Sequence, residues 1–148
     1  MSFSNDGIQV QEYVYDFAVD GGVSGTAINL SDKAGYAPLP NGAVVKGVTA
    51  LVLTSVSGTS STVSWGDETD TDGYSGTTIA EATLVAGYVE NGYANGTGGA
   101  LIWDDTEDSP KYPYANTDAK RGFTVLISTA NLTAGKIRFM VEYLLPTA

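Results

Sequence analysis

The clearest pattern in the chain is an alternation of hydrophobic and other residues with a period of two. It begins with Tyr13 and Tyr15 and continues through Phe17 and Val19. Because alternate side chains of a β-strand point to opposite faces, this pattern predicts a strand with a buried aromatic face. The cleanest such pattern is Lys136–Leu145, where the residues that share one face are Ile137, Phe139, Val141, Tyr143 and Leu145.

The longest apolar run, Ala43–Val56, has hydrophobic residues at both odd and even positions. A strand that is hydrophobic on both faces is expected where other parts of the protein cover both faces of the sheet. The run therefore predicts a central strand, or one whose outer face is sealed by a neighbouring subunit. Gly47 lies at a position where a β-bulge would bend a strand of this length.

Shorter strand-like segments fill much of the remaining chain, and sequences rich in Gly, Ser, Asn and Asp separate them. The predicted short strands are Thr26–Leu30, Thr62–Trp65, Ala100–Trp103 and Gly122–Thr129. The predicted turns include Asp20-Gly21-Gly22, Gly58–Ser61 and Thr133-Ala134-Gly135. About eight strands with long connections predict an all-β fold, a jelly-roll-like β-sandwich.

One short helix is predicted after residue 77. Thr78 and Glu81 have the spacing of a capping box, in which each side chain accepts from the backbone of the first turn. Gly87 can end the helix in a left-handed conformation. The residues between them that fall near helical spacing are Ile79, Ala82 and Val85. Such a helix would lie across one end of the sandwich.

The composition excludes many catalytic chemistries. The 148 residues include no cysteine and no histidine, and 17 acidic residues against 7 basic ones give a net charge of −10. These absences exclude disulfides, Cys/His zinc sites, Ser-His-Asp triads and cysteine nucleophiles. The negative charge disfavours nucleic acid as a direct partner, because binding a polyanion relies on Lys and Arg to displace its counterions. We expect a protein that is not an enzyme and has no cofactor.

A chain of this length is expected to form one domain with a sizeable core. Residues 1–12 indicate an extended, polar N-terminal arm that could reach a neighbouring molecule, and residues 13–148 indicate a single β-sandwich domain. The first residues lack the basic and apolar regions of a signal peptide. No apolar run approaches the roughly 20 residues that a membrane span needs. We therefore expect synthesis in the cytoplasm and no membrane partner.

An acidic cluster after Trp65 is the first candidate site. Glu68, Asp70 and Asp72, followed by Gly73, have the spacing of positions 1, 3, 5 and 6 of an EF-hand calcium loop. Position 12, where a bidentate Glu completes the calcium shell, is Ile79, and no helix pattern precedes the loop. The three carboxylates are therefore a weak calcium candidate, and the simpler interpretation is a solvated acidic turn.

A second acidic cluster contains Asp104, Asp105, Glu107 and Asp108. Paired carboxylates can hydrolyse glycosides, one as the acid and the other as the nucleophile or base. Nothing in the sequence places such a carboxylate in an apolar pocket. An exposed charged loop is the favoured interpretation, and a hydrolase acting through residues such as Asp105 or Asp72 is an alternative.

Aromatic residues supply a third candidate site. Four tyrosines in predicted loops could stack on sugar rings, namely Tyr88, Tyr93, Tyr112 and Tyr114. They leave open a second function, that of a carbohydrate-binding β-sandwich module. The tyrosines that alternate within predicted strands, Tyr13, Tyr15 and Tyr143, are assigned to the core or to a subunit interface.

Several sequence segments also occur in a recognisable order. They are YDFAVDGG at residues 15–22, LPNGAVV at 39–45, VSWG at 63–66, LTAGKI at 132–137 and VEYLLP at 141–146. With the valine-rich strand and the acidic turn between them, they resemble small virion structural proteins of tailed bacteriophages. The resemblance is to the capsid decoration, or cement, type, and it spans residues 13–146.

The resemblance implies a jelly-roll-like sandwich on the outside of an icosahedral head. There it would bind the major capsid protein and stabilise the shell without catalysis. It also implies a homotrimer, which would cover the outer apolar residues of Ala43–Val56 and Lys136–Leu145. No catalytic, cofactor-binding or metal-binding residue is carried over from it. The expected location is the exterior of the virion capsid, after synthesis in the host cytoplasm. Under the carbohydrate-binding alternative, the module would belong to a phage surface or tail appendage.

Overall fold

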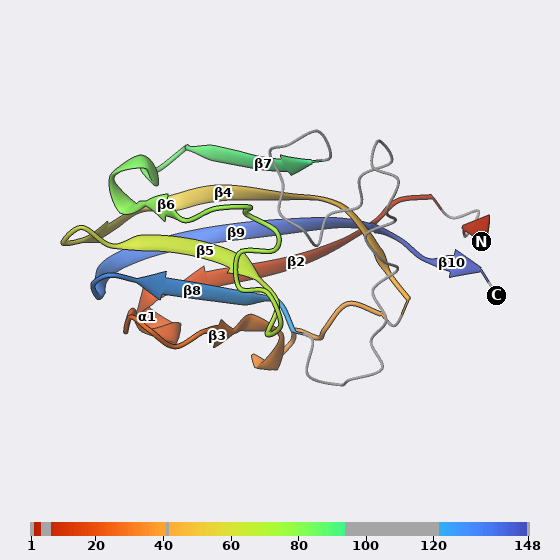
Figure 1. Cartoon of the computed structure of the whole chain (residues 1–148), viewed down its shortest axis with the longest axis horizontal. Helices are drawn as coiled ribbons and strands as arrows, with labels where there is room; N and C mark the ends of the chain where they lie inside the picture. Colours follow the sequence, from red (N-terminus) through yellow and green to blue (C-terminus); the bar gives the residue numbers. More distant parts are fainter. Residues whose placement is uncertain (1, 4–6, 41, 94–121, 148) are drawn as a thin grey trace.

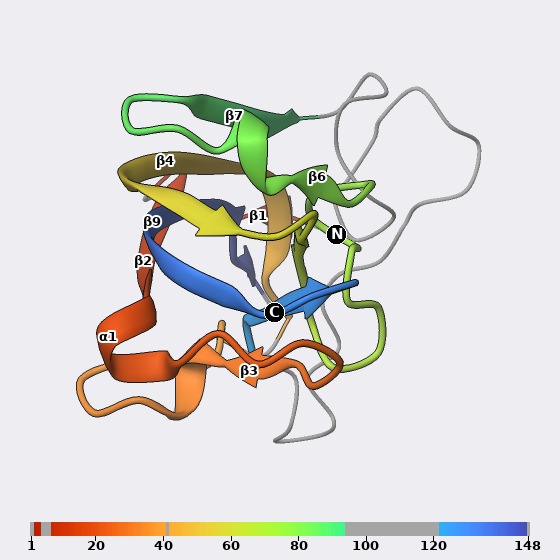
Figure 2. The ribbon, with the colours of Figure 1, turned by 90° about the vertical axis from the view of Figure 1, so that its left-hand side faces the viewer.

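Two antiparallel four-stranded sheets face each other in the computed structural model, which describes residues 2–3, 7–40, 42–93 and 122–147 (Figure 1, Figure 2). The first sheet has the order β2 (Gln9–Asp16), β9 (Leu132–Leu144), β4 (Val44–Gly58) and β7 (Val89–Tyr93). The second has the order β3 (Ile28–Asn29), β8 (Thr124–Ser128), β5 (Thr62–Gly66) and β6 (Ile79–Ala80). The predicted all-β sandwich of about eight strands with one short helix is confirmed.

The other described elements lie at the two ends of the sandwich. The strands β1 (Ser2–Phe3) and β10 (Pro146–Thr147) pair at one end, and the helix α1 (Phe17–Asp20) lies at the opposite end (Figure 1). Two short 3-10 helices complete the described elements, η1 (Leu30–Asp32) and η2 (Glu81–Thr83). No helix among the described residues has the length and apolar character that a membrane crossing requires.

The core lies between the two sheets, and its largest members are aromatic. The Phe139 ring on β9 lies 5.2 Å from Trp65 on β5 and 4.9 Å from Phe123, measured between ring centroids. Tyr13 on β2 stacks on Phe123 at 4.8 Å, and its hydroxyl donates to the Ala37 carbonyl. All four rings are buried, so the aromatic face predicted from the alternation is the one that joins the sheets.

β4 is a central strand, as its long apolar run predicted. It pairs with β9 on one side and with β7 on the other. The register between β4 and β9 shifts between Val45 and Gly47, which places an irregularity of the bulge type at the predicted glycine. The side chains of β4 that belong to the core cluster are Val45, Val48, Ala50, Val52 and Val56.

The strand predicted to continue through Val19 ends instead at Asp16, where the chain enters α1. The Asp16 carboxylate accepts a hydrogen bond from the backbone N–H of Ala18 at 3.0 Å and so caps the helix. The Asp20 carboxylate accepts from the backbone N–H of Asp16 at 2.8 Å. Gly21, with φ of 75°, then leads the chain away in a conformation that favours glycine. The two aspartates thus override the alternating pattern.

The helix predicted from Thr78 is wrong, because this segment forms β6 and then the three-residue η2. The Glu81 carboxylate accepts hydrogen bonds from the backbone N–H groups of Ser60 and Ser61, in the turn between β4 and β5. From Leu84 onward the chain runs alongside β4 and bonds to it. A glutamate that holds a distant turn is not available to cap a helix.

Two strand boundaries also differ from the sequence pattern. β2 begins at Gln9, which pairs with Tyr143 of β9, so residues 9–12 of the predicted arm lie in the sheet. β9 begins at Leu132, so the predicted turn at residues 133–135 is part of a strand. In both cases a long neighbouring strand supplies backbone partners beyond the region of clear alternation.

The strand predicted at residues 100–103 and the acidic cluster at residues 104–108 lie outside the described residues.

Candidate functional site

The acidic turn (residues 66–76) lies between β5 and β6, and hydrogen bonds between its own backbone groups fix its shape. The backbone N–H groups of Asp67 and Gly73 both donate to the Asp70 carbonyl at 3.0 Å. Gly66 has no space for a side chain, because a Cβ there would lie 2.0 Å from the Asp70 carbonyl oxygen. The shape of the turn therefore depends on the close approach of two backbone segments at a glycine.

Asp67 anchors this turn, and sequence reasoning did not single it out. Its side chain is 0% exposed. Its Oδ1 atom accepts from the Thr69 backbone N–H at 2.7 Å, from the Thr69 hydroxyl at 2.6 Å and from the Asp70 N–H at 2.9 Å. An Asp that bonds the backbone two or three residues ahead is a recurrent turn signal. That signal could have identified the anchor from the sequence.

The three calcium candidates have separate partners in the structure. The Glu68 carboxylate accepts from the side-chain amide of Asn29 and from the Gly122 N–H. The Asp70 carboxyl is instead affected by partial burial and by the neighbouring Asp72 carboxyl, and both raise its pKa. No group of three acidic side chains within the described ranges is arranged to hold a metal ion. Glu68 therefore links the acidic turn to the segments that contain Asn29 and Gly122, and it does not act together with Asp70 and Asp72.

The neighbouring carboxyls of Asp70 and Asp72 predict that the free energy of unfolding depends on pH. Partial burial and then the neighbouring Asp72 carboxyl raise the pKa of Asp70 above its ordinary value. The folded protein therefore binds more protons than the unfolded chain just above the ordinary aspartate pKa, and this contribution to stability falls as the pH rises through the raised pKa. We expect Asp70→Asn to raise the free energy of unfolding at pH 7 by about 0.5 kcal/mol, a small value because solvent still screens this partly buried pair.

Urea denaturation at pH 7 and at about pH 4 measures this effect, which should shrink at the lower pH because Asp70 then carries less negative charge. Asp32→Asn removes one negative charge from an exposed residue elsewhere and serves as the control. Equal stabilisation by the two substitutions would show a general charge effect and contradict the role of the pair.

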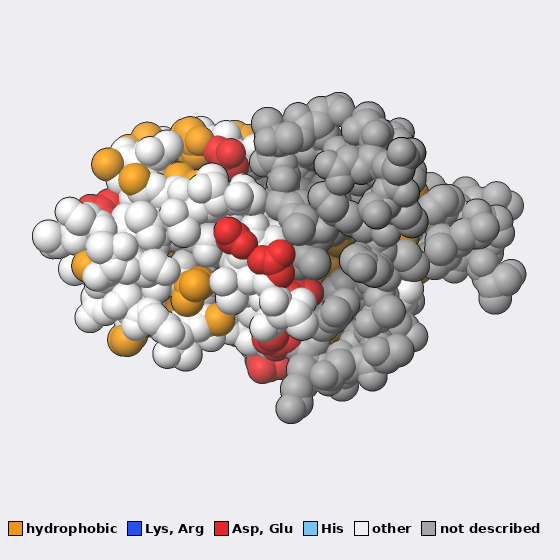
Figure 3. Space-filling model, in the orientation of Figure 1, with side chains coloured by type: hydrophobic (Ala, Val, Ile, Leu, Met, Phe, Trp, Pro, Cys, Tyr) orange, Lys and Arg blue, Asp and Glu red, His pale blue; other side chains and the backbone are white. Residues whose placement is uncertain are grey.

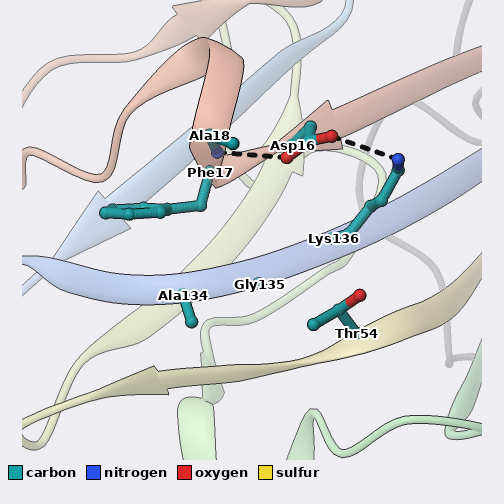
Figure 4. A pocket seen from close by; sticks show the side chains of 7 residues that line it. All are labelled: Asp16, Phe17, Ala18, Thr54, Ala134, Gly135 and Lys136. Atoms are coloured by element: carbon teal, nitrogen blue, oxygen red, sulfur yellow. Dashed lines mark hydrogen bonds and ion pairs between the residues drawn. The ribbon is translucent and has the colours of Figure 1, made fainter.

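A shallow pocket of about 330 Å³ lies where β2 turns into α1 (Figure 4). The Lys136 ammonium lies 3.1 Å from Asp16 Oδ2 in this pocket, and this contact lowers the pKa of Asp16. The lining residues are Asp16, Phe17, Ala18, Thr54, Ala134, Gly135 and Lys136. They include one carboxylate, already paired with a lysine. A glycosidase needs two carboxylates that flank the substrate, so this lining does not supply that chemistry.

The outer face of the first sheet, meaning the outward side chains of β2, β9, β4 and β7, combines paired charges with exposed aliphatic groups. Arg138 Nε lies 3.4 Å from Glu12 Oε1, and the Lys136–Asp16 pair lies beside it along the same two strands. The exposed aliphatic residues of this face are Val10, Leu53 and Val89. A sheet face of this composition suits contact with another protein.

Charge is unevenly distributed between the two sides of the sandwich. On the described part of the side occupied by the second sheet, Figure 3 shows several acidic side chains and no basic one. The opposite side carries Lys136 and Arg138 in ion pairs. The outer face of the first sheet is therefore the better place for an acidic protein to approach another surface.

Of the four loop tyrosines, Tyr88 is the one whose side chain is described. Its hydroxyl donates to the Glu90 carboxylate, which raises the pKa of Tyr88, and its ring packs against the hydrophobic core. Part of the ring is therefore used in packing, and its hydroxyl is already bonded to Glu90. Tyr112, Tyr114 and the side chain of Tyr93 lie outside the described residues.

The fold itself has counterparts among phage capsids. No protein-family model matches the chain, and no curated protein matches it. A chain of the cyanophage Pam1 capsid asymmetric unit is similar with a TM-score of 0.57 and 20% identity, over 94% of this chain and 85% of that chain. A chain of the acid-stable capsid of Helicobacter pylori bacteriophage KHP30 is similar with a TM-score of 0.52 and 18% identity, over 98% of this chain and 91% of that chain. This chain therefore shares the β-sandwich fold of both capsid chains over nearly its whole length.

Proposed function

We propose that this protein is a structural component of a tailed-phage virion, which binds the outside of the head as a decoration, or cement, protein. The observation that carries the proposal is the shared fold, since two chains from phage capsids match 94% and 98% of this chain. The ordered sequence segments support the same class of protein, because they resemble virion proteins of the decoration type.

The proposed mechanism is adhesive. Each copy would add one interface with the major capsid protein, and the sum over many copies would raise the barrier to rupture of the shell. The outer face of the first sheet supports this role, because its paired charges can exchange partners with a complementary surface while its exposed valines lose contact with water. In this mechanism no residue acts as a catalyst.

Co-sedimentation of the purified protein with expanded phage heads tests the proposal. Arg138→Gln removes the cation of one ion pair on the outer face, and we expect it to weaken binding about tenfold, equivalent to about 1.4 kcal/mol. Ala82→Glu changes the net charge by the same amount at an exposed position in η2, and we expect it to bind as the wild type does.

Failure of the wild-type protein to bind heads at any stage of maturation would remove the proposal. Equal weakening by Arg138→Gln and Ala82→Glu would leave the decoration role but reject the outer face as the contact surface. Electron microscopy of virions with and without the protein tests the proposed exterior position. Light scattering tests the expected homotrimer, which would have three times the chain mass of 15.4 kDa.

A further inference from the structure

The strand β7 forms one edge of the first sheet, and its edge differs from the others in the described part of the protein. Edge strands expose a row of backbone N–H and C=O groups, which natural proteins usually shield. On the opposite edge of this sheet, Lys33 Nζ donates to the Val14 carbonyl of β2 at 2.8 Å and is held there by Asp20 at 2.9 Å. In the second sheet, the edge strands β3 and β6 have only two residues each.

β7 has none of these protective features. It spans five residues, pairs with β4 without a register shift, and contains neither lysine nor proline. Val89, paired with Leu51 of β4, is 46% exposed, and Asn91 is exposed as well. Leu53 of β4 and Val85, which precedes the strand, are also exposed. Among the described residues, the strand thus combines an unpaired edge with adjacent apolar surface.

The hydrogen-bond pattern fixes which backbone groups of β7 point outward. The Val52 N–H donates to the Tyr88 carbonyl at 3.0 Å, and the register places Leu51 opposite Val89. In an antiparallel pair, hydrogen-bonded and non-hydrogen-bonded residue pairs alternate. Val89 and Asn91 are therefore at non-hydrogen-bonded positions relative to β4. Their N–H and C=O groups point to the open edge, where another strand could bind them.

We propose that β7 pairs antiparallel with β7 of a second copy of this chain, so that the two four-stranded sheets become one continuous sheet across a twofold axis. A second copy can pair in a register that keeps the like charges of the strand apart. With Asn91 on the axis, Glu90 lies opposite Gly92 of the second copy, so the two Glu90 carboxylates are not directly opposed. The same register places Val89 opposite residue 93 of the second copy.

This inference goes beyond the proposed function and does not depend on it, because it concerns contact between copies in the absence of a phage head. A twofold contact brings copies together in pairs. The expected mass is twice the chain mass if this is the sole contact. It is six times the chain mass if the threefold contact expected from the sequence resemblance also forms. Raising the salt concentration should favour pairing, because each copy carries a net charge of −10.

Light scattering of the purified full chain, with matched substitutions on the two edges of the first sheet, tests the pairing. Val89→Lys places a charge on the open edge, and we expect it to halve the assembly mass. Val10→Lys makes the same change at a valine that is 60% exposed on the opposite edge strand, β2, and should leave the mass unchanged. Thermal melting checks that both variants fold.

Asn91→Pro provides a second test, because it removes an N–H that β4 does not use and should also halve the mass. Hydrogen exchange adds a direct readout, since the Val89 and Asn91 amides should be protected in the wild type and exchange rapidly in Val89→Lys. A wild-type protein that is monomeric or purely trimeric at both low and high salt would overturn the proposal. So would a mass that Val10→Lys lowers as much as Val89→Lys does.

Discussion

Replacing Phe139 with alanine is expected to lower the free energy of unfolding by about 4 kcal/mol. The Phe139 side chain is fully buried, and its ring contacts Trp65 and Phe123 at 5.2 and 4.9 Å between centroids. Truncation removes these ring contacts, which join the two sheets, and leaves a cavity in an interior that cannot fully collapse. A domain whose total stability is about 5–15 kcal/mol would lose a large part of it. Urea denaturation followed by tryptophan fluorescence measures the loss.

Met140→Ala is the matched control for this prediction. Met140 is the next residue on β9, but its side chain points to the outer face and is only half-buried. We expect it to cost about 1 kcal/mol, since less apolar area returns to water and no internal cavity forms. Similar losses for the two substitutions would mean that the space between the sheets is not the main source of stability.

The substitution Gly66→Ala is expected to cost about 3 kcal/mol, because overpacking against backbone is relieved only by moving the chain. The added Cβ would lie 2.0 Å from the Asp70 carbonyl oxygen, so the acidic turn would have to open. Opening would also disturb the hydrogen bonds that Asp67 makes inside the turn. Thermal melting, together with near-ultraviolet circular dichroism of the neighbouring Trp65, measures the effect.

Gly35→Ala separates steric overlap from backbone conformation. Gly35 has φ of 85° and open space where a Cβ would lie, so alanine there should cost only about 1 kcal/mol through backbone strain. A Gly66→Ala protein that melts with the wild type would show that the turn tolerates displacement of the Asp70 carbonyl.

The sequence predicts the elements whose pattern is local and repeated. The burial of Tyr13 and Tyr15, the central position of β4 and the irregularity at Gly47 all follow from alternation or from one glycine. Burial on one face of a sheet leaves a period of two in the sequence, and this signal does not depend on distant residues. The β-sandwich could therefore be predicted from the chain alone.

The errors occur where a polar side chain bonds a backbone group that the local pattern does not reveal. Glu81 has the spacing from Thr78 that a helix cap requires, yet its carboxylate holds Ser60 and Ser61 in another turn. Glu68 is a weak calcium candidate by its spacing, with a solvated acidic turn as the simpler interpretation, and in the structure its carboxylate accepts from Asn29 and Gly122, far away in the sequence. Spacing alone cannot distinguish a carboxylate that binds a metal ion or caps a helix from one that links two distant segments by hydrogen bonds, because the residue type is the same.

The strand order of the first sheet also constrains how the protein is made. β2 and β4 are not paired with each other, and both pair with β9. After β2 has been synthesised, the ribosome must add more than a hundred residues before its partner begins at Leu132. At about 5–20 residues per second, β2 spends roughly 6–25 seconds without its partner strand. The first sheet therefore cannot form its complete set of pairs until β9 has been synthesised.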